Sequence, residues 1–244
     1  MHNGINLNPK AIEVIEKLRE NLKKIVFLSN APRPSSKVIE FLKRMKMDEK
    51  FLSKVVTSGE AAMKAINQNK FGEKFYHLGP SRDQSLFEKV LENKTSLDSC
   101  DFIICTGLFD EHEKDLDYYE DLLKGHTSKN FICTNPDLIV HRGNIEELCA
   151  GSVAKTFVSL GGKVIYYGKP YKEIYKMCFE QGEKVLAVGD NLRTDIKGAN
   201  NLNIDSLFIY NGVHRNEIKN IKEISVLLKN YNVKTNFFQK DLEW

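Results

Sequence analysis

Long apolar runs are absent from this 244-residue sequence, and no stretch approaches the roughly 20 consecutive apolar residues that a membrane-spanning helix needs. The N-terminus has no apolar core of the kind found in signal peptides. The sequence also lacks a large excess of charge of one sign, because 36 Lys and Arg against 33 Asp and Glu leave a formal net charge of +3. The basic residues are spread along the chain. We therefore expect a cytoplasmic protein with neither a membrane nor a nucleic acid as its partner.

Cysteine is also scarce, and the five cysteines contain no C-x-x-C pair. Most lie inside apolar runs such as residues 101–107 and 130–135, and their number is odd. The six histidines are scattered, and no H-E-x-x-H motif occurs. We interpret the cysteines as buried thiols of a reducing compartment and predict no metal site built on them.

Two glycine-rich phosphate-binding motifs are missing, namely G-x-G-x-x-G and G-x-x-x-x-G-K-[ST]. The nearest match, residues 161–163, precedes a predicted strand instead of following one. This disfavours a binder of dinucleotides or nucleoside triphosphates. A phosphate-receiver domain, which uses Asp, Ser or Thr and Lys at strand ends, is a further alternative, but it would not carry an inserted second domain.

Short apolar strands alternate with helices along the chain. Asn8 and Pro9 have the pattern of a helix cap and first turn, and an apolar stripe at helical spacing follows them. Further helices are predicted after a cap at Ser35 or Ser36, after a capping box at residues 57–60, and over the acidic residues 111–123. The strands are predicted at residues 24–29, 55–56, 75–78, 102–105, 131–134, 164–167, 185–188 and 207–210.

This alternation predicts an α/β fold with a mostly parallel sheet. The nearly continuous apolar run at residues 24–29 is typical of a strand that is buried on both faces. Residues 79–81 and 168–170 contain Gly and Pro and are signals of turns or segment boundaries. They bracket a middle segment that we expect to fold as an inserted domain. The tail after Lys234 is predicted to be peripheral.

Polar residues follow several of these strands, and in open parallel sheets ligands bind beyond the carboxyl ends of the strands. Asp190 follows the strand at 185–188, and Asp195 comes five residues later. Mg²⁺ is held by one or two carboxylates together with phosphate and water, so this pair is a candidate metal site. Taken alone, the pattern fits a turn and a charged first helical turn better.

The other strand ends carry Ser29 and Asn30, then Asn135 and Asp137, and finally Lys169. A lysine between Gly and Pro suits a fixed ammonium that neutralises phosphate, although a single lysine is more often solvated. The hydroxyl and amide at the first strand end could bind phosphate oxygens or form a local cap. Each feature is ambiguous alone, but their order along the chain is specific.

The strings LSNAPRPS, CTNPD, GKPY and VGDNLRTDI, at residues 28–35, 133–137, 168–171 and 188–196, carry a family resemblance. Three of them resemble the second, third and fourth motifs of haloacid dehalogenase (HAD) superfamily hydrolases of class IIA. That class includes nucleotide and sugar-phosphate phosphatases, and its α/β cap lies between the second and third motifs. The resemblance covers essentially the whole chain.

The resemblance implies a Rossmann-like core made of residues 1–79 and 165–244, and a cap made of residues 80–164. It also implies Mg²⁺-dependent hydrolysis of a small phosphorylated metabolite through an aspartyl-phosphate. Caps of this class commonly dimerise in the family, so a homodimer through the cap is a further expectation. The substrate is not named by any motif.

Residue roles come with the resemblance. Ser29 and Asn30 would bind the phosphoryl group, and Lys169 would balance its charge as a catalytic residue. Asp190 would ligate Mg²⁺, and Asp195 would support that site as a second catalytic residue. The CTNPD string adds the two residues of the cap loop that would face the substrate, Asn135 and Asp137.

The first motif of the family carries a nucleophilic aspartate at the end of the central core strand and continues to His-Asn-Gly, and residues 1–4 resemble only the tail of that motif. We therefore expect that the sequence is truncated before the nucleophile, which leaves open whether this chain is itself an enzyme. The strands at 24–29 and 185–188 would then lack their common neighbour. The alternative is a catalytically inactive relative or a protein that binds a phosphometabolite without turnover.

Overall fold

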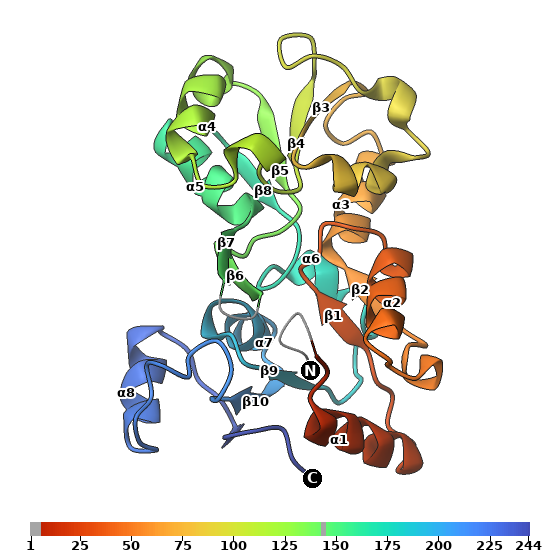
Figure 1. The fold of residues 1–244 in the computed structure, drawn as a ribbon, viewed down its shortest axis with the longest axis vertical. Coiled ribbons are helices and arrows are strands. Elements are labelled where there is room, and N and C mark those ends of the chain that lie inside the picture. Colours follow the sequence, from red (N-terminus) through yellow and green to blue (C-terminus); the bar gives the residue numbers. More distant parts are fainter. Residues whose placement is uncertain (1–5, 143–144) are drawn as a thin grey trace.

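The computed structural model describes residues 6–142 and 145–244, which form two lobes (Figure 1). The helices are α1 (Pro9–Glu20), α2 (Ser35–Arg44), α3 (Ser58–Ile66), α4 (Leu116–Leu123), α5 (Ala150–Ser159), α6 (Lys172–Tyr175), α7 (Lys197–Leu202) and α8 (Glu223–Asn230). The strands are β1 (Phe27–Ser29), β2 (Val55–Thr57), β3 (Phe75–Leu78), β4 (Phe102–Cys105), β5 (Asn130–Cys133), β6 (Ile139–Arg142), β7 (Ile145–Leu148), β8 (Val164–Tyr166), β9 (Leu186–Gly189), β10 (Asp205–Ile209) and β11 (Phe237–Gln239). Shorter helical turns occur at Glu49–Phe51, Ser81–Phe87, Leu91–Asn93, Asp110–His112, Lys124–His126 and Leu192–Ile196.

The upper lobe in Figure 1 is built on one four-stranded parallel sheet in the order β3-β4-β5-β8. Alternate residues of β4 point to opposite faces, as in any strand. Ile103 joins the core beneath α4 and α5, whereas Phe102 and Ile104 join the core that includes α3 and α6. All four residues of β4 are buried, as expected for a strand covered on both faces.

This sheet extends beyond the segment 80–164 that we expected to form the cap. Its outer strand β3 ends at Leu78, and its other outer strand β8 begins at Val164 and ends at Tyr166. The core that includes α3 and α6 connects the sheet to the lower lobe. The division of the chain at residues 79 and 165 therefore stays a prediction.

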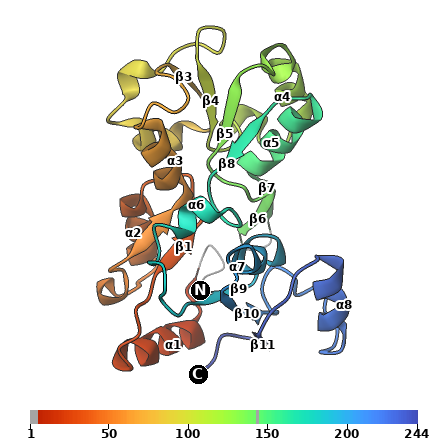
Figure 2. The ribbon, with the colours of Figure 1, turned by 180° about the vertical axis from the view of Figure 1, so that it is seen from behind.

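The lower lobe contains two separate parallel sheets within residues 6–142 and 145–244. β1 pairs with β2, and the other sheet has the order β11-β10-β9. β1 and β9 thus each have one edge along which the described residues place no strand. The two views agree that β1 and β9 both lie in this lobe, with β10 next to β9 (Figures 1 and 2).

The free edge of β9 leaves apolar side chains in solvent. Leu186 is 49% exposed and Val188 is 44% exposed, although both lie in a parallel strand that sequence alone would bury. The residues of β1 are only partly buried, so our prediction of a strand buried on both faces at 24–29 is wrong for this structure. The physical reason is the missing neighbour beside each strand among the described residues.

Local capping rules were followed in part. The Asn8 side chain accepts the N–H groups of Lys10 and Ala11 and begins α1 as predicted. α2 differs, because neither predicted serine caps it. It begins at Ser35 itself, whose N–H and hydroxyl both donate to the Glu60 carboxylate.

The capping box at residues 57–60 is only half formed. The Thr57 hydroxyl accepts the N–H of Glu60 at 3.3 Å, which begins α3. The Glu60 carboxylate does not return to Thr57 because it is already bonded to Ser35 on α2. A tertiary contact has therefore replaced half of a local motif.

The remaining predictions concern the acidic segment, the tail and the thiols. A short turn at Asp110–His112 and α4 replace the single helix predicted at 111–123. The tail adds β11, in which Phe237 stays 57% exposed. All five cysteines are free and buried, which confirms the predicted burial. In the described part of the chain, no helix combines the length and the apolar character that crossing a membrane requires.

Candidate functional site

The predicted site residues come from the carboxyl ends of strands in the two lobes. Ser29 is the last residue of β1, and Asp190 follows β9. Lys169 lies in the loop between β8 and α6, and Asp137 lies in the loop after β5. The sheet edges thus converge where open parallel sheets usually bind ligands.

Lys169 and Asp195 form the central ion pair of the site. The Lys169 Nζ lies 2.6 Å from Asp195 Oδ1, and the two side chains are 17% and 12% exposed. Burial by itself lowers the pKa of Lys169, but the carboxylates of Asp195 and Asp137 outweigh burial and raise that pKa above its usual range. The lysine is therefore a permanent cation at any physiological pH.

Asp195 also organises the loop that follows β9. Its Oδ2 accepts the backbone N–H of Asp190 at 3.2 Å and that of Asn191 at 3.0 Å. Both of its oxygens are thus engaged, one by the lysine and one by the backbone. Gly189 makes this approach possible, since a Cβ there would lie 2.2 Å from Asp195 Cγ.

The backbone of Lys169 is held by Asn30, the residue that follows β1 in the lower lobe. Asn30 Oδ1 accepts the Lys169 N–H at 2.7 Å, and Asn30 Nδ2 donates to the Lys169 carbonyl at 3.1 Å. The preceding Gly168 has φ +125°, and a Cβ there would lie 2.6 Å from Pro136 Cδ. This paired amide contact fixes the loop that carries the lysine.

The phosphate-binding roles of Ser29 and Asn30 stay predictions. The Ser29 hydroxyl accepts the N–H of Ala31 at 3.1 Å, which closes a local turn but leaves its proton available to a ligand. The buried Asn30 side chain uses both its amide oxygen and its amide nitrogen to bind the Lys169 backbone. The hydrogen bonds seen here give Asn30 a positioning role.

Asp190 is the carboxylate best suited to a metal. Burial and the nearby Asp195 carboxylate raise the pKa of Asp190, so a bound cation would stabilise its ionised form. Its Oδ2 accepts the N–H of Val213 at 3.0 Å, and Gly212 leaves room for it because a Cβ there would lie 2.0 Å from that oxygen. No partner for Oδ1 is found among the described residues.

The site fits a Mg²⁺ ion that takes few ligands from this chain. Within residues 6–142 and 145–244, no three His, Cys, Asp or Glu side chains gather closely enough to hold a metal. Mg²⁺ usually binds through one or two carboxylates and completes its shell with phosphate and water. Asp190 would supply the one carboxylate, while Asp195 is already committed to Lys169.

Asp137 faces this group from the loop after β5. The N–H of Asp137 donates to Asn135 Oδ1 at 3.1 Å, and Asn135 is buried. Burial raises the pKa of Asp137 to about 6, an effect that Lys169 opposes and Asp195 reinforces. The structure thus brings Asp137 close to the lysine, while Asn135 shapes its loop.

Two residues near the site, Tyr175 and His214, have no motif in the sequence that points to them. The Tyr175 side chain is buried near Lys169 and Asp195, and its hydroxyl has no hydrogen-bond partner among the described residues. His214 is fully buried, and its Nε2 accepts the N–H of Leu192 at the start of the turn that carries Asp195. His214 Nδ1 lies 2.6 Å from Glu217 Oε1, which orients the ring. Neither residue directly follows a strand, so the position of strand ends in the sequence does not indicate them.

Comparison with known proteins agrees with this geometry. A family model described as haloacid dehalogenase-like hydrolase matches residues 1–91, and a second one, HAD-hydrolase-like, matches residues 166–228. The two matches together cover more than half of the chain and both strand-end loops that hold Lys169 and Asp190. No curated protein matches.

Solved structures resemble the chain over nearly its full length. A hydrolase of the haloacid dehalogenase-like family from Brucella suis 1330 is 27% identical, with a TM-score of 0.85 over 99% of this chain and 91% of its own. A 4-nitrophenylphosphatase from Thermotoga maritima is 26% identical, with a TM-score of 0.72 over 99% and 92%.

A more distant structure supports the fold alone. A possible sugar phosphatase of the HAD superfamily from Cytophaga hutchinsonii is 18% identical, with a TM-score of 0.77 over 98% of this chain and 89% of its own. Together these matches confirm the predicted α/β fold with parallel sheets. The chain belongs to the haloacid dehalogenase-like hydrolase superfamily.

Proposed function

We propose that this chain forms most of the active site of a Mg²⁺-dependent phosphatase that hydrolyses the monoester of a small phosphorylated metabolite. The observation that carries the proposal is the meeting of one buried lysine with carboxylates from both lobes. Lys169 lies 2.6 Å from Asp195, and its charge is also felt by Asp137 and Asp190. A buried lysine can bind a ligand that carries several negative charges, and the carboxylates can hold a metal ion that binds the same ligand.

Each residue has a distinct task in this proposal. Lys169 donates to a phosphate oxygen, and Asn30 and Asp195 hold its backbone and its ammonium in place. Asp190 is the ligand for Mg²⁺, which would neutralise charge between the phosphate and the group that attacks it. Asp137 faces the same space from the upper lobe and would contact the substrate.

The attacking group in this superfamily is an aspartate, and none of the three site carboxylates suits that task. Asp195 has both oxygens engaged, Asp190 is assigned to the metal, and Asp137 belongs to the cap loop. We propose that the nucleophile is carried by a strand that lies between β1 and β9. Its carboxylate would attack phosphorus while the alcohol leaves with a proton, and water would then release phosphate and restore the carboxylate.

The free edges of β1 and β9 support a strand at this place. Leu186 and Val188 on β9 are unusually exposed, and β1 has no partner on its second side among the described residues. The segments that flank β1 and β9 are linked at both ends of the strands. Lys24 before β1 pairs with Glu183 before β9 at 2.8 Å. After the strands, Asn30 holds the Lys169 backbone, and the Lys169 ammonium pairs with Asp195, which follows β9.

A fusion experiment tests this proposal. An apolar strand ending in Asp-Val-Trp-Gly-Val is joined ahead of residue 2, and a matched fusion carries Asn in place of that Asp. Filling the edge and burying Leu186 and Val188 should raise the free energy of unfolding by about 2–5 kcal/mol in both fusions. Only the Asp fusion should hydrolyse p-nitrophenyl phosphate, and only with Mg²⁺ present.

The outcomes separate the parts of the proposal. Stabilisation of both fusions without hydrolysis by either would contradict the phosphatase assignment but keep the strand. Hydrolysis by the original 244-residue chain, lost in Lys169→Met, would show that the nucleophile lies elsewhere in this sequence. A Lys169→Met change in the active fusion should abolish turnover, while Lys229→Gln on α8 should leave turnover unchanged.

A phosphometabolite-binding protein without turnover is the second candidate. It is favoured by one observation, namely that Lys169 and Asp190 can bind phosphate and metal without any nucleophile. This candidate predicts Mg²⁺-dependent binding of inorganic phosphate by the original chain and no hydrolysis by the Asp fusion. Titration calorimetry with phosphate, together with the assay above, distinguishes the two.

A further inference from the structure

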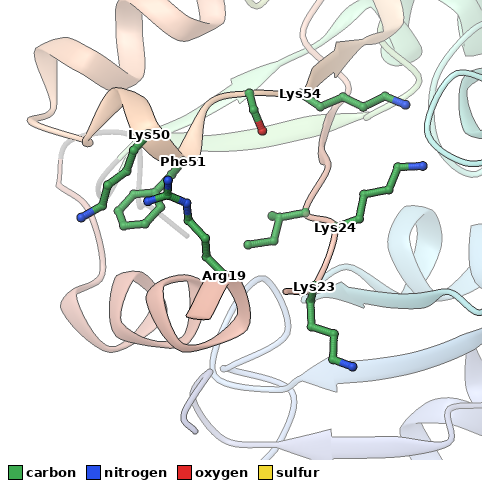
Figure 3. A pocket seen from close by; sticks show the side chains of 8 residues that line it. Arg19, Lys23, Lys24, Lys50, Phe51 and Lys54 are labelled. Carbon is green, nitrogen blue, oxygen red and sulfur yellow. The ribbon is translucent and has the colours of Figure 1, made fainter. Parts of the chain in front are cut away.

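A basic pocket lies at the end of the lower lobe opposite the candidate active site. It has a volume of about 310 Å³, and Figure 3 shows the side chains that line it. Five of the lining residues are basic: Arg19, Lys23, Lys24, Lys50 and Lys54. They come from the end of α1, the segment before β1 and the turn before β2, so they gather at the amino ends of the strands.

The floor of the pocket is apolar and its wall offers a hydroxyl. Ile25 and the buried Phe51 are the apolar lining residues, and the exposed Ser53 adds a hydroxyl group. The Arg19 guanidinium extends beside the Phe51 ring, while Lys24 and Lys54 extend in a common direction (Figure 3). Lys50 Nζ lies 4.8 Å from the centroid of the same ring.

The positive charge of this pocket is only partly neutralised. Lys50 pairs with Glu16 at 2.9 Å and with Asp48 at 3.2 Å, and Lys24 pairs with Glu183. Arg19 and Lys23 have no acidic group within 4.0 Å among the described residues. None of the three carboxylates lines the pocket itself, and the Lys54 Nζ donates to the Cys178 carbonyl at 3.0 Å. The surplus of positive charge at the pocket therefore comes from Arg19 and Lys23.

We propose that this pocket binds a small, multiply charged anion of the phosphate type, at a site separate from the one around Lys169. Guanidinium and ammonium groups with a nearby hydroxyl form the donor set that phosphate oxygens prefer. The volume matches the lower range of small-molecule sites. The proposal does not depend on the function proposed above.

A small anion fits this surface better than a nucleic acid does. A long polyanion would have to run past the rim, where the exposed carboxylates of Glu16, Asp48 and Glu183 would repel it. A compact anion would need only the basic groups that line the pocket and would not have to pass these carboxylates. The chain's net charge of only +3 agrees with a local site and not with a broad basic surface.

Titration with inorganic tripolyphosphate tests the proposal, with NaCl at matched ionic strength as the reference. The full chain is compared with Arg19→Gln/Lys23→Gln and with Lys222→Gln/Lys229→Gln, which removes two exposed charges near α8. Losing two charge-assisted contacts should weaken binding by at least roughly tenfold in the pocket variant and not in the control. The single change Lys23→Gln should give an intermediate loss, and thermal unfolding checks that each variant is folded.

Several results would overturn the proposal. Equal binding by the pocket variant and the control would assign the anion to another site, such as the one around Lys169. Tripolyphosphate binding no tighter than the salt reference would remove the site altogether. Tight binding of a single-stranded oligonucleotide that the pocket variant loses, without binding of tripolyphosphate, would identify a polymeric partner instead.

Discussion

The Lys169 ammonium and the Asp195 carboxylate form an ion pair 2.6 Å long with little exposure to solvent, and residues of both strand-end loops depend on it. Asp195 also accepts two backbone N–H groups of the loop after β9, so it remains partly satisfied when the lysine is removed. The pair therefore couples the position of the cation to the shape of the loop that carries Asp190.

Replacing Lys169 with Met should lower the free energy of unfolding by about 2–4 kcal/mol, because it leaves a mostly buried carboxylate without its cation. The double change Lys169→Met/Asp195→Asn should cost less than the sum of the single changes, with a coupling of about 1–3 kcal/mol. Urea unfolding at pH 7 of the four proteins measures this cycle. Strictly additive losses would mean that the pair is solvated and contributes little.

Asp137→Asn should stabilise the protein at neutral pH. The carboxyl has an unfolded pKa of 3.8 and a folded pKa of about 6, so the folded state holds its proton more tightly. The wild-type protein therefore loses stability as pH rises from about 4 to 6, by about 1–3 kcal/mol, and the variant avoids this loss.

Unfolding in metal-free urea at pH 4.5, 6 and 7.5 follows this difference. Asp137 faces Lys169, Asp195 and Asp190, so all three charges contribute to the measured change. Asp121→Asn on the exposed side of α4 is the matched control and should show no such trend. A constant difference at all three pH values would mean that Asp137 does not titrate in this range.

Tyr175→Phe should raise the free energy of unfolding by about 1 kcal/mol, because the buried hydroxyl that it removes has no partner among the described residues. Tyr119→Phe is a chemically identical control with the opposite expectation. The Tyr119 hydroxyl accepts the N–H of Phe109 at 2.6 Å, so its removal should cost about 1–2 kcal/mol. Thermal and urea unfolding compare the two, and destabilisation by both would show that Tyr175 holds a bound water.

His77 should make the upper lobe sensitive to acid. It is buried and bonded to Thr106 Oγ1 at 2.9 Å, and burial lowers its pKa from 6.5 to about 4. The unfolded state therefore binds more protons between these values, and stability is lost as pH falls from 6.5 towards 4, by about 3 kcal/mol at most.

His77→Gln keeps a hydrogen-bonding group near Thr106 without this titration. The variant should show a flatter stability profile between pH 6.5 and 4, whereas the control His112→Gln should keep the wild-type slope. Unfolding in urea at four pH values across this window is the measurement. A slope that His77→Gln leaves unchanged would assign acid sensitivity to other groups.

The outlines of the strands and the order of the motif residues could be read from the sequence. Strands such as β3 and β4 appear at the predicted residues because short runs rich in apolar and aromatic residues between turn residues are local signals. Lys169 and Asp195 were selected for the same reason, since strand ends of parallel sheets share one edge. The helix N-cap at Asn8 depends on atoms only two and three residues away.

Only the tertiary structure decided which partners these groups take. The capping box places Glu60 at its own helix, but Glu60 binds Ser35 instead. Asn30 holds the Lys169 backbone 139 residues away, a contact that no local pattern indicates. A hydrogen-bonding side chain goes to whichever partner folding brings near, and such partners lie too far along the chain for a pattern to reveal.

The exposure of β9 and the presence of the basic pocket both depend on contacts between segments that are distant in the sequence. The apolar composition of residues 185–188 predicts a covered strand, but coverage depends on a neighbouring strand that the described residues do not provide, so Leu186 and Val188 stay exposed. The basic residues around Arg19 were spread through the sequence, and only packing of α1 against the ends of β1 and β2 brings them together. The sequence by itself thus determined the helices and strands and the chemistry of their side chains. The tertiary structure decided which side chains are buried and which lie together, because both depend on contacts between distant segments.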